Sequence, residues 1–545
     1  MAGALDGVKQ LRDLTNPRNV RRLFAAGMIT PATPIAVGAA LPWLLGRGPT
    51  LGVLVRINAI SVGSKDAIRD RRGSMTWKEL DMASNKVARA LERAGVEPGG
   101  KVGLLLRNGR EMAATAFAAQ KAGIIVCPLN TWAKTKELKA VMANVEPVLL
   151  VYDTAHAEQV EKTVSEGVSL VYVGERSEAL EGSISFEDFI EGCSGAPLPP
   201  FTLHRGSAKI VIQTSGTTGT PKGASRDASA AGIGALASLL GSVPYRRDDV
   251  IVCPAPLFHS FGLATFTFGT AIGATLVLPP KFDPEEVLRL IEEHKATAVS
   301  LVPVMIRRIV SLPDEVKHRY DLSSVRIVLA SGSAISQDLK KAAMELFGEV
   351  LYDLYGSTEA GWVAIATPDD IKENPKSLGK PTDGIEVAVF SPDGEKLPPG
   401  ETGELFIKSD YMFEGYTSGE SKDERDGYMS IGDLGRLDED GYLYVESRSD
   451  DMVVVGGENV YPIEVEDVIE SLSGVNEVTV LGIEDDEYGH VLAAFVVGNV
   501  TEDDVIGACK QELASYKVPK RVKVVDELPR TSTGKVLKRD LVDQL

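Results

Sequence analysis

Residues 209–224 read KIVIQTSGTTGTPKGA. The first residues are rich in Ile and Val and predict a strand, which leads directly into a loop of glycine and hydroxyl side chains. Glycines allow backbone N–H groups to approach an anion, and hydroxyl and lysine side chains supply further donors. This composition predicts a polyphosphate site made by Thr214, Ser215, Gly216, Thr217, Thr218, Gly219 and Lys222.

The loop differs from the usual P-loop. Pro221 precedes the lysine and Gly223 follows it, whereas the P-loop needs Gly-Lys and then a Ser or Thr that binds magnesium. A flexible linker has a similar composition. Taken alone, the loop is therefore either a phosphate cradle or a linker.

Length and charge limit the kinds of protein that this chain can be. A chain of 545 residues exceeds one hydrophobic core, so at least two domains are expected. A net charge of -19 argues against a nucleic-acid partner, because the phosphates would repel it. The cysteines are scattered and predict reduced thiols in a cytoplasmic protein, with neither a disulfide framework nor a zinc site. They are Cys127, Cys193, Cys253 and Cys509.

Residues 23–46 carry no charge, and Arg21 and Arg22 lie just before them, so a membrane segment has to be considered. Three prolines are expected to break any helix through this run. They are Pro31, Pro34 and Pro42. Two interpretations stay open: peripheral contact with a membrane surface through residues 43–45, or an apolar segment packed on the first domain.

Strand and helix patterns alternate along the first two thirds of the chain, which predicts a doubly wound α/β fold. Strands are expected at residues 102–106, 124–128, 148–152, 251–254, 274–278, 298–302 and 325–330. Helices are expected after residue 74 and at 111–122 and 134–143. Residues 154–205 are expected to be a connection, and short strands after residue 379 predict a small β subdomain.

Further segments, in series between about residues 74 and 538, resemble the landmarks of the adenylate-forming enzymes, which include acyl-CoA synthetases, luciferases and peptide-synthetase adenylation domains. The loop at 209–224 matches that family's signature nearly letter for letter. The resemblance implies a large N-terminal AMP-binding domain, residues 1–449, with doubly wound α/β subdomains and a small β subdomain. It also implies a small mobile α+β C-terminal domain, residues 450–545, with a hinge at Asp450.

Three segments resemble the family's nucleotide site. Residues 331–334 (SGSA) resemble the adenine-binding turn, which implies Gly332, Ser333 and Ala334. Residues 352–359 (YDLYGSTE) imply that Tyr355 stacks on adenine beside Gly356, that Thr358 contacts the α-phosphate, and that Glu359 holds Mg²⁺. Residues 430–435 (SIGDLG) imply that Asp433, assisted by Arg448, binds the ribose hydroxyls. The family usually has threonine in place of Ile431 and often lysine in place of Asp450.

Three other segments resemble the parts that handle the acid and CoA. Residues 257–262 (LFHSFG) imply that His259 orients the substrate carboxylate, with a core histidine as the alternative. The glycines Gly456 and Gly457 would pass close to the pantetheine arm of CoA, or else form a tight turn. Residues 528–535 (LPRTSTGK) imply that Lys535 holds the carboxylate and the α-phosphate together.

The resemblance implies ATP-dependent activation of a carboxylic acid through an acyl-adenylate to an acyl-CoA thioester, with ATP, Mg²⁺ and CoA. An apolar stretch at 261–273 favours a medium- or long-chain fatty acid, although a buried helix needs the same residues. Its apolar members are Leu263, Phe266, Phe268 and Ile272. Two alternatives are an acyl-adenylate ligase that loads a carrier protein and a catalytically silent fatty-acid-binding or uptake protein.

Overall fold

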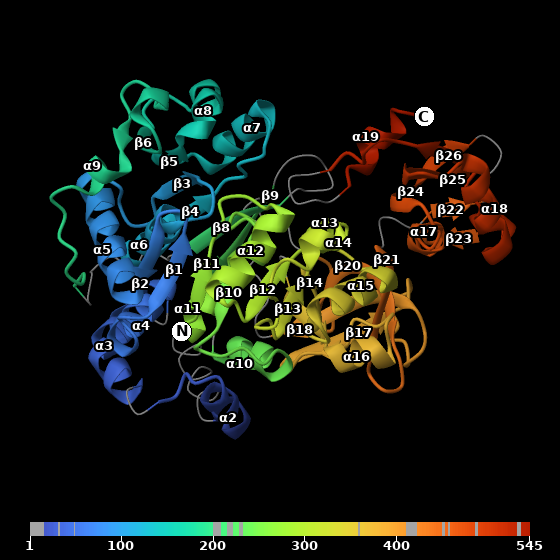
Figure 1. Ribbon diagram of the computed structural model, residues 1–545, viewed down its shortest axis with the longest axis horizontal. Coiled ribbons are helices and arrows are strands. Elements are labelled where there is room, and N and C mark those ends of the chain that lie inside the picture. The colour runs from blue at the N-terminus through green and yellow to red at the C-terminus, as the bar shows by residue number, and fades with distance from the viewer. Residues whose placement is uncertain are drawn as a thin grey trace.

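The structure is a computed structural model of the chain. It describes residues 16–30, 33–47, 50–199, 209–214, 222–227, 233–357, 360–409, 422–448, 453–455, 458–485, 489–530 and 536–545. The ribbon in Figure 1 shows a large α/β body with a smaller unit, drawn in red, at one side. The smaller unit holds the C-terminal residues.

Two sheets with mainly parallel strands form the large body. The seven-stranded sheet has the order β7-β6-β5-β3-β4-β8-β9. Its strands are β3 (Lys101–Leu105), β4 (Ile125–Pro128), β5 (Leu149–Asp153), β6 (Ser169–Val173), β7 (Ile184–Ser185), β8 (Lys209–Thr214) and β9 (Lys222–Asp227). All of its pairs are parallel except β8 with β9.

The nine-stranded sheet has the order β16-β15-β14-β13-β12-β10-β11-β1-β2. Its strands are β1 (Asp66–Asp70), β2 (Gly73–Thr76), β10 (Val250–Val252), β11 (Thr275–Val277), β12 (Ala298–Leu301), β13 (Ile327–Ala330), β14 (Leu351–Ser357), β15 (Gly361–Ala366) and β16 (Lys380–Pro381). The central strands are parallel, and antiparallel strands close both edges.

Helices cover both faces of these sheets, which confirms the doubly wound prediction. They are α4 (Leu51–Ser61), α5 (Trp77–Arg93), α6 (Arg110–Ala122), α7 (Thr135–Val145), α8 (Ala157–Thr163), α9 (Phe186–Ile190), α10 (Ile233–Ser242), α11 (Ser260–Ile272), α12 (Pro284–His294), α13 (Pro303–Val310), α14 (Asp314–Lys317), α15 (Gln337–Phe347) and α16 (Pro368–Glu373). Where the two sheets meet, Phe117 of α6 stacks on Phe266 of α11 with ring centroids 4.9 Å apart. One hydrophobic core therefore joins the sheets.

The prediction that residues 154–205 are only a connection is wrong, because they contain α8, β6, β7 and α9. Strand β6 lies in register beside β5 and buries Val171, Tyr172 and Val173. The buried run is only three residues long, and glycines surround it in the sequence. The sequence therefore gives only a weak indication of a strand here, and pairing with β5 stabilises it.

After residue 379 the chain forms the predicted small β subdomain. Its antiparallel strands are β17 (Ile385–Phe390), β18 (Gly403–Ser409), β19 (Glu424–Arg425), β20 (Tyr428–Leu437) and β21 (Leu443–Arg448). Its core packs against the end of the nine-stranded sheet through Ala360, Val363 and Ala364.

The C-terminal unit is a small α+β domain with its own hydrophobic core. It comprises β22 (Val453–Val455), β23 (Glu458–Val460), α17 (Pro462–Glu470), β24 (Val475–Asp485), β25 (Gly489–Gly498), α18 (Glu502–Glu512), β26 (Arg521–Val524) and α19 (Lys538–Val542). Arg307 of α13 reaches across to it, pairing with Glu470 and donating to the carbonyl of Asn476 at 2.8 Å. A boundary at residue 450 stays a prediction, since residues 449–452 lie outside the described part.

At the N-terminus the chain forms α2 (Pro17–Ala25) and α3 (Thr33–Arg47). The prediction that prolines break any helix in this run is wrong for residues 33–47. Pro34 lies in the first turn of α3, where no intrahelical donor is needed, and the helix continues through Pro42. Among the described residues, no helix combines the length and apolar character needed to cross a bilayer.

Candidate active site

Three of the predicted site positions lie at the carboxyl ends of parallel strands in the nine-stranded sheet. The loop after β10 leads to His259, the loop after β13 carries Gly332, and β14 itself carries Tyr355. Parallel strands present their carboxyl ends at one sheet edge, and ligands of α/β proteins bind in crevices there. Segments far apart in the chain are thus gathered at one edge.

A hydrogen bond joins two of the predicted residues. The Tyr355 hydroxyl donates to the Asp433 carboxylate, which connects β14 to β20 across 78 residues of sequence. Asp433 lies directly opposite Arg448 in the β20–β21 pair. Opposite residues in antiparallel strands are close neighbours. The structure therefore brings together the three positions expected at adenine and ribose.

Close backbone packing explains two of the predicted glycines. A Cβ atom at Gly356 would lie 1.9 Å from the carbonyl oxygen of Gly361, which no side chain can tolerate. Gly332 has a φ of +104°, and a Cβ there would lie 3.2 Å from Val302. The backbone at both positions therefore requires glycine, in strand β14 for Gly356 and in the bend after β13 for Gly332, whether or not a nucleotide contacts them. Ser333 and Ala334 follow Gly332 directly in the sequence.

The phosphate loop connects β8 to β9. Thr214 and Lys222 are opposite each other in that antiparallel pair, so the two ends of the loop meet. The rest of the loop lies outside the described residues, as do other predicted positions, whose roles stay predictions. They are Ser215, Gly216, Thr217, Thr218, Gly219, Thr358, Glu359, Asp450, Gly456, Gly457 and Lys535.

His259 is the N-cap residue of α11 and is only partly buried. Its ring lies 4.4 Å from that of Phe258 and 6.3 Å from that of Trp132, measured between centroids. Trp132 belongs to the loop after β4, and its side chain is half exposed. The partial exposure of His259 argues against a core histidine, and the two aromatic rings give it an apolar wall.

Asn108 supports the segment that leads to His259, and the sequence did not indicate this. Its Nδ2 donates to the carbonyl oxygens of Ala255 at 3.0 Å and Cys253 at 3.4 Å, while its Oδ1 accepts from the N–H of Leu257 at 2.9 Å. Asn108 lies in the loop between β3 of the seven-stranded sheet and α6, and its partners lie in the loop after β10 of the other sheet. Because the hydrogen-bond partners of Asn108 lie about 150 residues away in the sequence, no local sequence pattern reveals this role.

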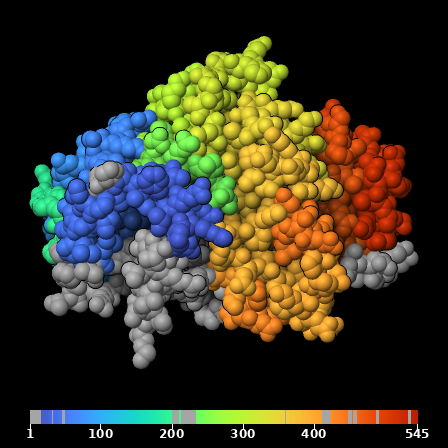
Figure 2. Space-filling view, turned by 90° about the horizontal axis from the view of Figure 1, so that it is seen from below, coloured from blue at the N-terminus to red at the C-terminus, as the bar shows by residue number. Residues whose placement is uncertain are grey.

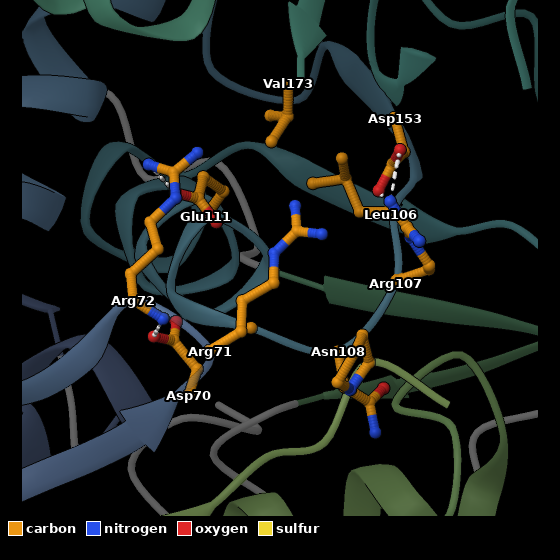
Figure 3. A pocket seen from close by; sticks show the side chains of 11 residues that line it. Asp70, Arg71, Arg72, Leu106, Arg107, Asn108, Glu111, Asp153 and Val173 are labelled. Carbon is orange, nitrogen blue, oxygen red and sulfur yellow. Dashed lines mark hydrogen bonds and ion pairs between the residues drawn. The ribbon is translucent and has the colours of Figure 1, made fainter. Parts of the chain in front are cut away.

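Asn108 also lines a surface cavity of about 370 Å³, open solvent included. Figure 3 shows two ion pairs at its wall, Arg107 with Asp153 at 2.7 Å and Arg72 with Glu111 at 2.8 Å. Burial raises the pKa of Glu111. Because the carboxylates offset the arginines, this cavity has no strong charge of one sign.

The apolar stretch after His259 is buried in the core. Its side chains Leu263, Phe266, Phe268 and Ile272 belong to the hydrophobic core between the sheets. Phe268, for example, packs on Tyr245 with centroids 4.7 Å apart. The stretch is the buried helix α11, so it carries no information on the length of an acyl chain.

Tyr355 on β14 bonded to Asp433 on β20, the β8–β9 pair at the predicted phosphate loop, and a separate small C-terminal domain agree with the architecture expected of an adenylate-forming enzyme. Residues 57–417 match the family described as AMP-binding enzyme, and residues 464–535 match the AMP-binding enzyme C-terminal domain. The chain belongs to the AMP-binding enzyme family, part of the adenylate-forming superfamily.

Relatives cover nearly the whole chain. The long-chain-fatty-acid–CoA ligase FadD13 of Mycobacterium tuberculosis is 30% identical, covering 92% of this chain and 98% of that ligase. The feruloyl-CoA synthase of an Amycolatopsis species is 31% identical, covering 87% and 95%. The solved structure of o-succinylbenzoate CoA synthetase from Bacillus subtilis with its acyl-adenylate intermediate superimposes with a TM-score of 0.77 at 28% identity, covering 90% and 97%. These three proteins act on different acids.

Proposed function

We propose that the protein is a CoA ligase that works in two half-reactions. A carboxylate oxygen attacks the α-phosphorus of ATP, forming the acyl-adenylate and releasing pyrophosphate. The sulfur of CoA then attacks the acyl carbon, forming the thioester and releasing AMP. The arrangement of Tyr355 at the sheet edge with Asp433 and Arg448 of the β subdomain carries this proposal, together with the CoA-ligase names of the relatives.

The proposed roles follow from the side chains. Tyr355 stacks on adenine, and the carboxylate of Asp433 accepts hydrogen bonds from the ribose hydroxyls. His259, against the rings of Phe258 and Trp132, orients the carboxylate of the acid. The apolar wall suits an acid with an apolar group next to its carboxylate.

Lys535 and Thr358 would contact the reacting carboxylate and the α-phosphate, and the loop between β8 and β9 would hold the remaining phosphates. Mg²⁺ at Glu359 would neutralise phosphate charge. In the part of the chain that the structure describes, no cluster of three His, Cys, Asp or Glu side chains could hold a metal. Magnesium therefore stays a prediction that rests on Glu359, and the CoA contact rests on Gly456 and Gly457.

The acid is proposed to be a medium- or long-chain fatty acid in a cytoplasmic setting. The similarity to FadD13 supports this choice. An aromatic acid is the second candidate, favoured by the similarity to feruloyl-CoA synthase and by the aromatic wall at Trp132 and Phe258.

AMP release, measured with fatty acids of increasing length and with aromatic acids, each with and without CoA, tests this proposal. Release that needs both an acid and CoA is the expected result. Adenylate formation without CoA-dependent AMP release would favour a ligase that loads a carrier protein. A complete absence of acid-dependent ATP consumption would favour the silent binding protein.

A further inference from the structure

The first part of the chain differs in charge from the rest. Residues 14–65 contain no Asp or Glu, although 77 acidic residues in 545 would place about seven in a stretch of 52. The same stretch contains basic residues, which give it a formal charge of +6. They are Arg18, Arg21, Arg22, Arg47, Arg56 and Lys65. A positive segment is thus attached to a protein whose net charge is -19.

Helices α2 and α3 of this segment expose large apolar side chains. The exposed fraction of the side chain is 67% for Phe24, 72% for Ile35 and 47% for Leu41, and Val20 and Val37 are also exposed. Single exposed apolar residues are ordinary on a protein surface. Five such side chains occur within two consecutive helices, a density that marks a candidate interaction site. We call this set the α2–α3 surface.

Helix α2 exposes both basic and apolar side chains. Arg18, Val20, Arg21 and Phe24 are all exposed, while Leu23 is buried against the body. Arg22 points elsewhere and pairs with Asp383 at 2.5 Å. Both helices lie at the lower edge of the molecule in Figure 1, and Figure 2 views that side, with this N-terminal segment in dark blue.

We propose that the α2–α3 surface docks on anionic membranes. Amphipathic helices with basic residues beside aromatic and aliphatic ones bury their apolar side chains at the headgroup boundary, while arginines pair with lipid phosphates. Neither helix spans the bilayer, so the contact is peripheral. A symmetric dimer through this surface is disfavoured, because it would place the exposed Arg18 and Arg21 of two copies against each other.

This docking gives the proposed function a physical advantage. Long-chain fatty acids partition into membranes, so a ligase held at the surface meets a higher local concentration of its acid. That consequence rests on the proposed function, whereas membrane binding itself does not. Vesicle binding without substrates therefore tests the docking independently of the reaction.

The experiment measures flotation of the full-length protein with vesicles of phosphatidylcholine alone and with added phosphatidylglycerol. We expect binding to the anionic vesicles that weakens as salt rises. Phe24→Ser/Ile35→Ser should weaken it by about tenfold or more, since both side chains lose burial in the bilayer. Arg18→Glu/Arg21→Glu should weaken binding to the anionic vesicles by at least about fivefold for each arginine.

Matched controls change the same residue types outside the α2–α3 surface. Val148→Ser/Ile184→Ser removes two other exposed apolar side chains, and Arg71→Glu/Arg176→Glu reverses two other exposed charges. Thermal unfolding shows that each variant is folded. The proposal is overturned if the native protein binds neither vesicle type, or if the control pairs lose binding as much as the test pairs. It is also overturned if the test pairs change only the oligomeric state.

Discussion

Tyr355 and Asp433, joined by a hydrogen bond, form the best-described part of the proposed nucleotide site. Replacing Asp433 with Ala removes the proposed acceptors for the ribose hydroxyls and the acceptor of the Tyr355 hydroxyl. Hydrogen bonds to a charged group contribute about 1.5 to 3 kcal/mol each, so the KM for ATP should rise by about tenfold to a hundredfold. Tyr355→Phe, which keeps the ring, should raise it less.

Comparison of ATP with 2′-deoxy-ATP separates a ribose role from a structural one. If Asp433 binds the 2′-hydroxyl, Asp433→Ala should lose less with the deoxy nucleotide than with ATP. An equal loss with both nucleotides would mean that Asp433 does not bind the 2′-hydroxyl.

Asn108 provides a test of how the acid site is positioned. Asn108→Ala removes three hydrogen bonds to the loop before His259, so we expect a raised KM for the acid and an unchanged KM for ATP. Loss of the bonds should also lower stability by about 1 to 3 kcal/mol. Asn85→Ala is the control for lost stability without a change at the site, because the buried Asn85 amide donates to the carbonyl of Gly195 and accepts from Lys121. Similar kinetics in both variants would show that Asn108 matters only for stability.

Among individual residues, the sequence predicted those that belong to motifs. It missed residues whose contacts are with segments far away in the chain. Tyr355 and Asp433 were found because their neighbours form a recognisable pattern. Asn108 and Trp132 belong to no motif, and their partners lie in the loop after β10, far away in the sequence. The apolar residues of α11 were ambiguous, since burial and substrate binding require the same side chains.

At the scale of elements, a buried ion pair supports the strand that carries Tyr355. Lys340 of α15 lies 2.9 Å from Asp353 of β14, and their side chains are 3% and 4% exposed. Burial raises the pKa of Asp353. Lys340→Met leaves this carboxyl group without its cation, so the free energy of unfolding should fall by about 3 to 5 kcal/mol.

Chemical denaturation of the single and double variants checks this expectation. Lys340→Met/Asp353→Leu removes both charges and should recover most of the stability, because two apolar side chains can fill the buried space. A double variant as unstable as the single one would show that the pair contributes through packing alone.

Sequence patterns predicted the buried parallel strands β3, β4, β5, β10, β11, β12 and β13 and the helices α5, α6 and α7, whose apolar residues are buried. They did not predict the edge strands or most of the other helices of the large domain. They failed for β6, whose buried run is short, and for α3, where Pro34 and Pro42 fit a helix that the proline rule excluded. Local sequence patterns indicate only the propensity of a segment for helix or strand. Where that propensity is weak, packing against the rest of the protein decides the structure.

At the scale of the whole molecule, the pair between Arg307 and Glu470 joins the two domains. If the C-terminal domain rotates about Asp450 between the half-reactions, this contact belongs to one orientation only. Arg307→Glu should then change the rates of the adenylation and thioester steps in opposite directions. Arg307→Glu/Glu470→Arg should restore both rates.

Separate assays with ATP and acid, and with supplied acyl-adenylate and CoA, measure the two steps. Parallel losses in Arg307→Glu would mean that the domain is a fixed lid. The small β subdomain and the α+β C-terminal unit agree with the sequence prediction, but no sequence pattern indicated that Arg307 links the domains. Contacts between domains depend on an orientation that local patterns do not encode.

Exchange of labelled pyrophosphate into ATP, measured without CoA, tests the central claim most directly. We predict exchange that depends on an added acid and falls by about 10² to 10³ in Lys535→Ala, the loss typical of one donor aimed at developing charge. Lys510→Ala, which changes an exposed lysine on α18, should leave exchange unchanged. If no acid supports exchange, or if exchange proceeds equally without acid, the protein does not form an acyl-adenylate and the account is wrong.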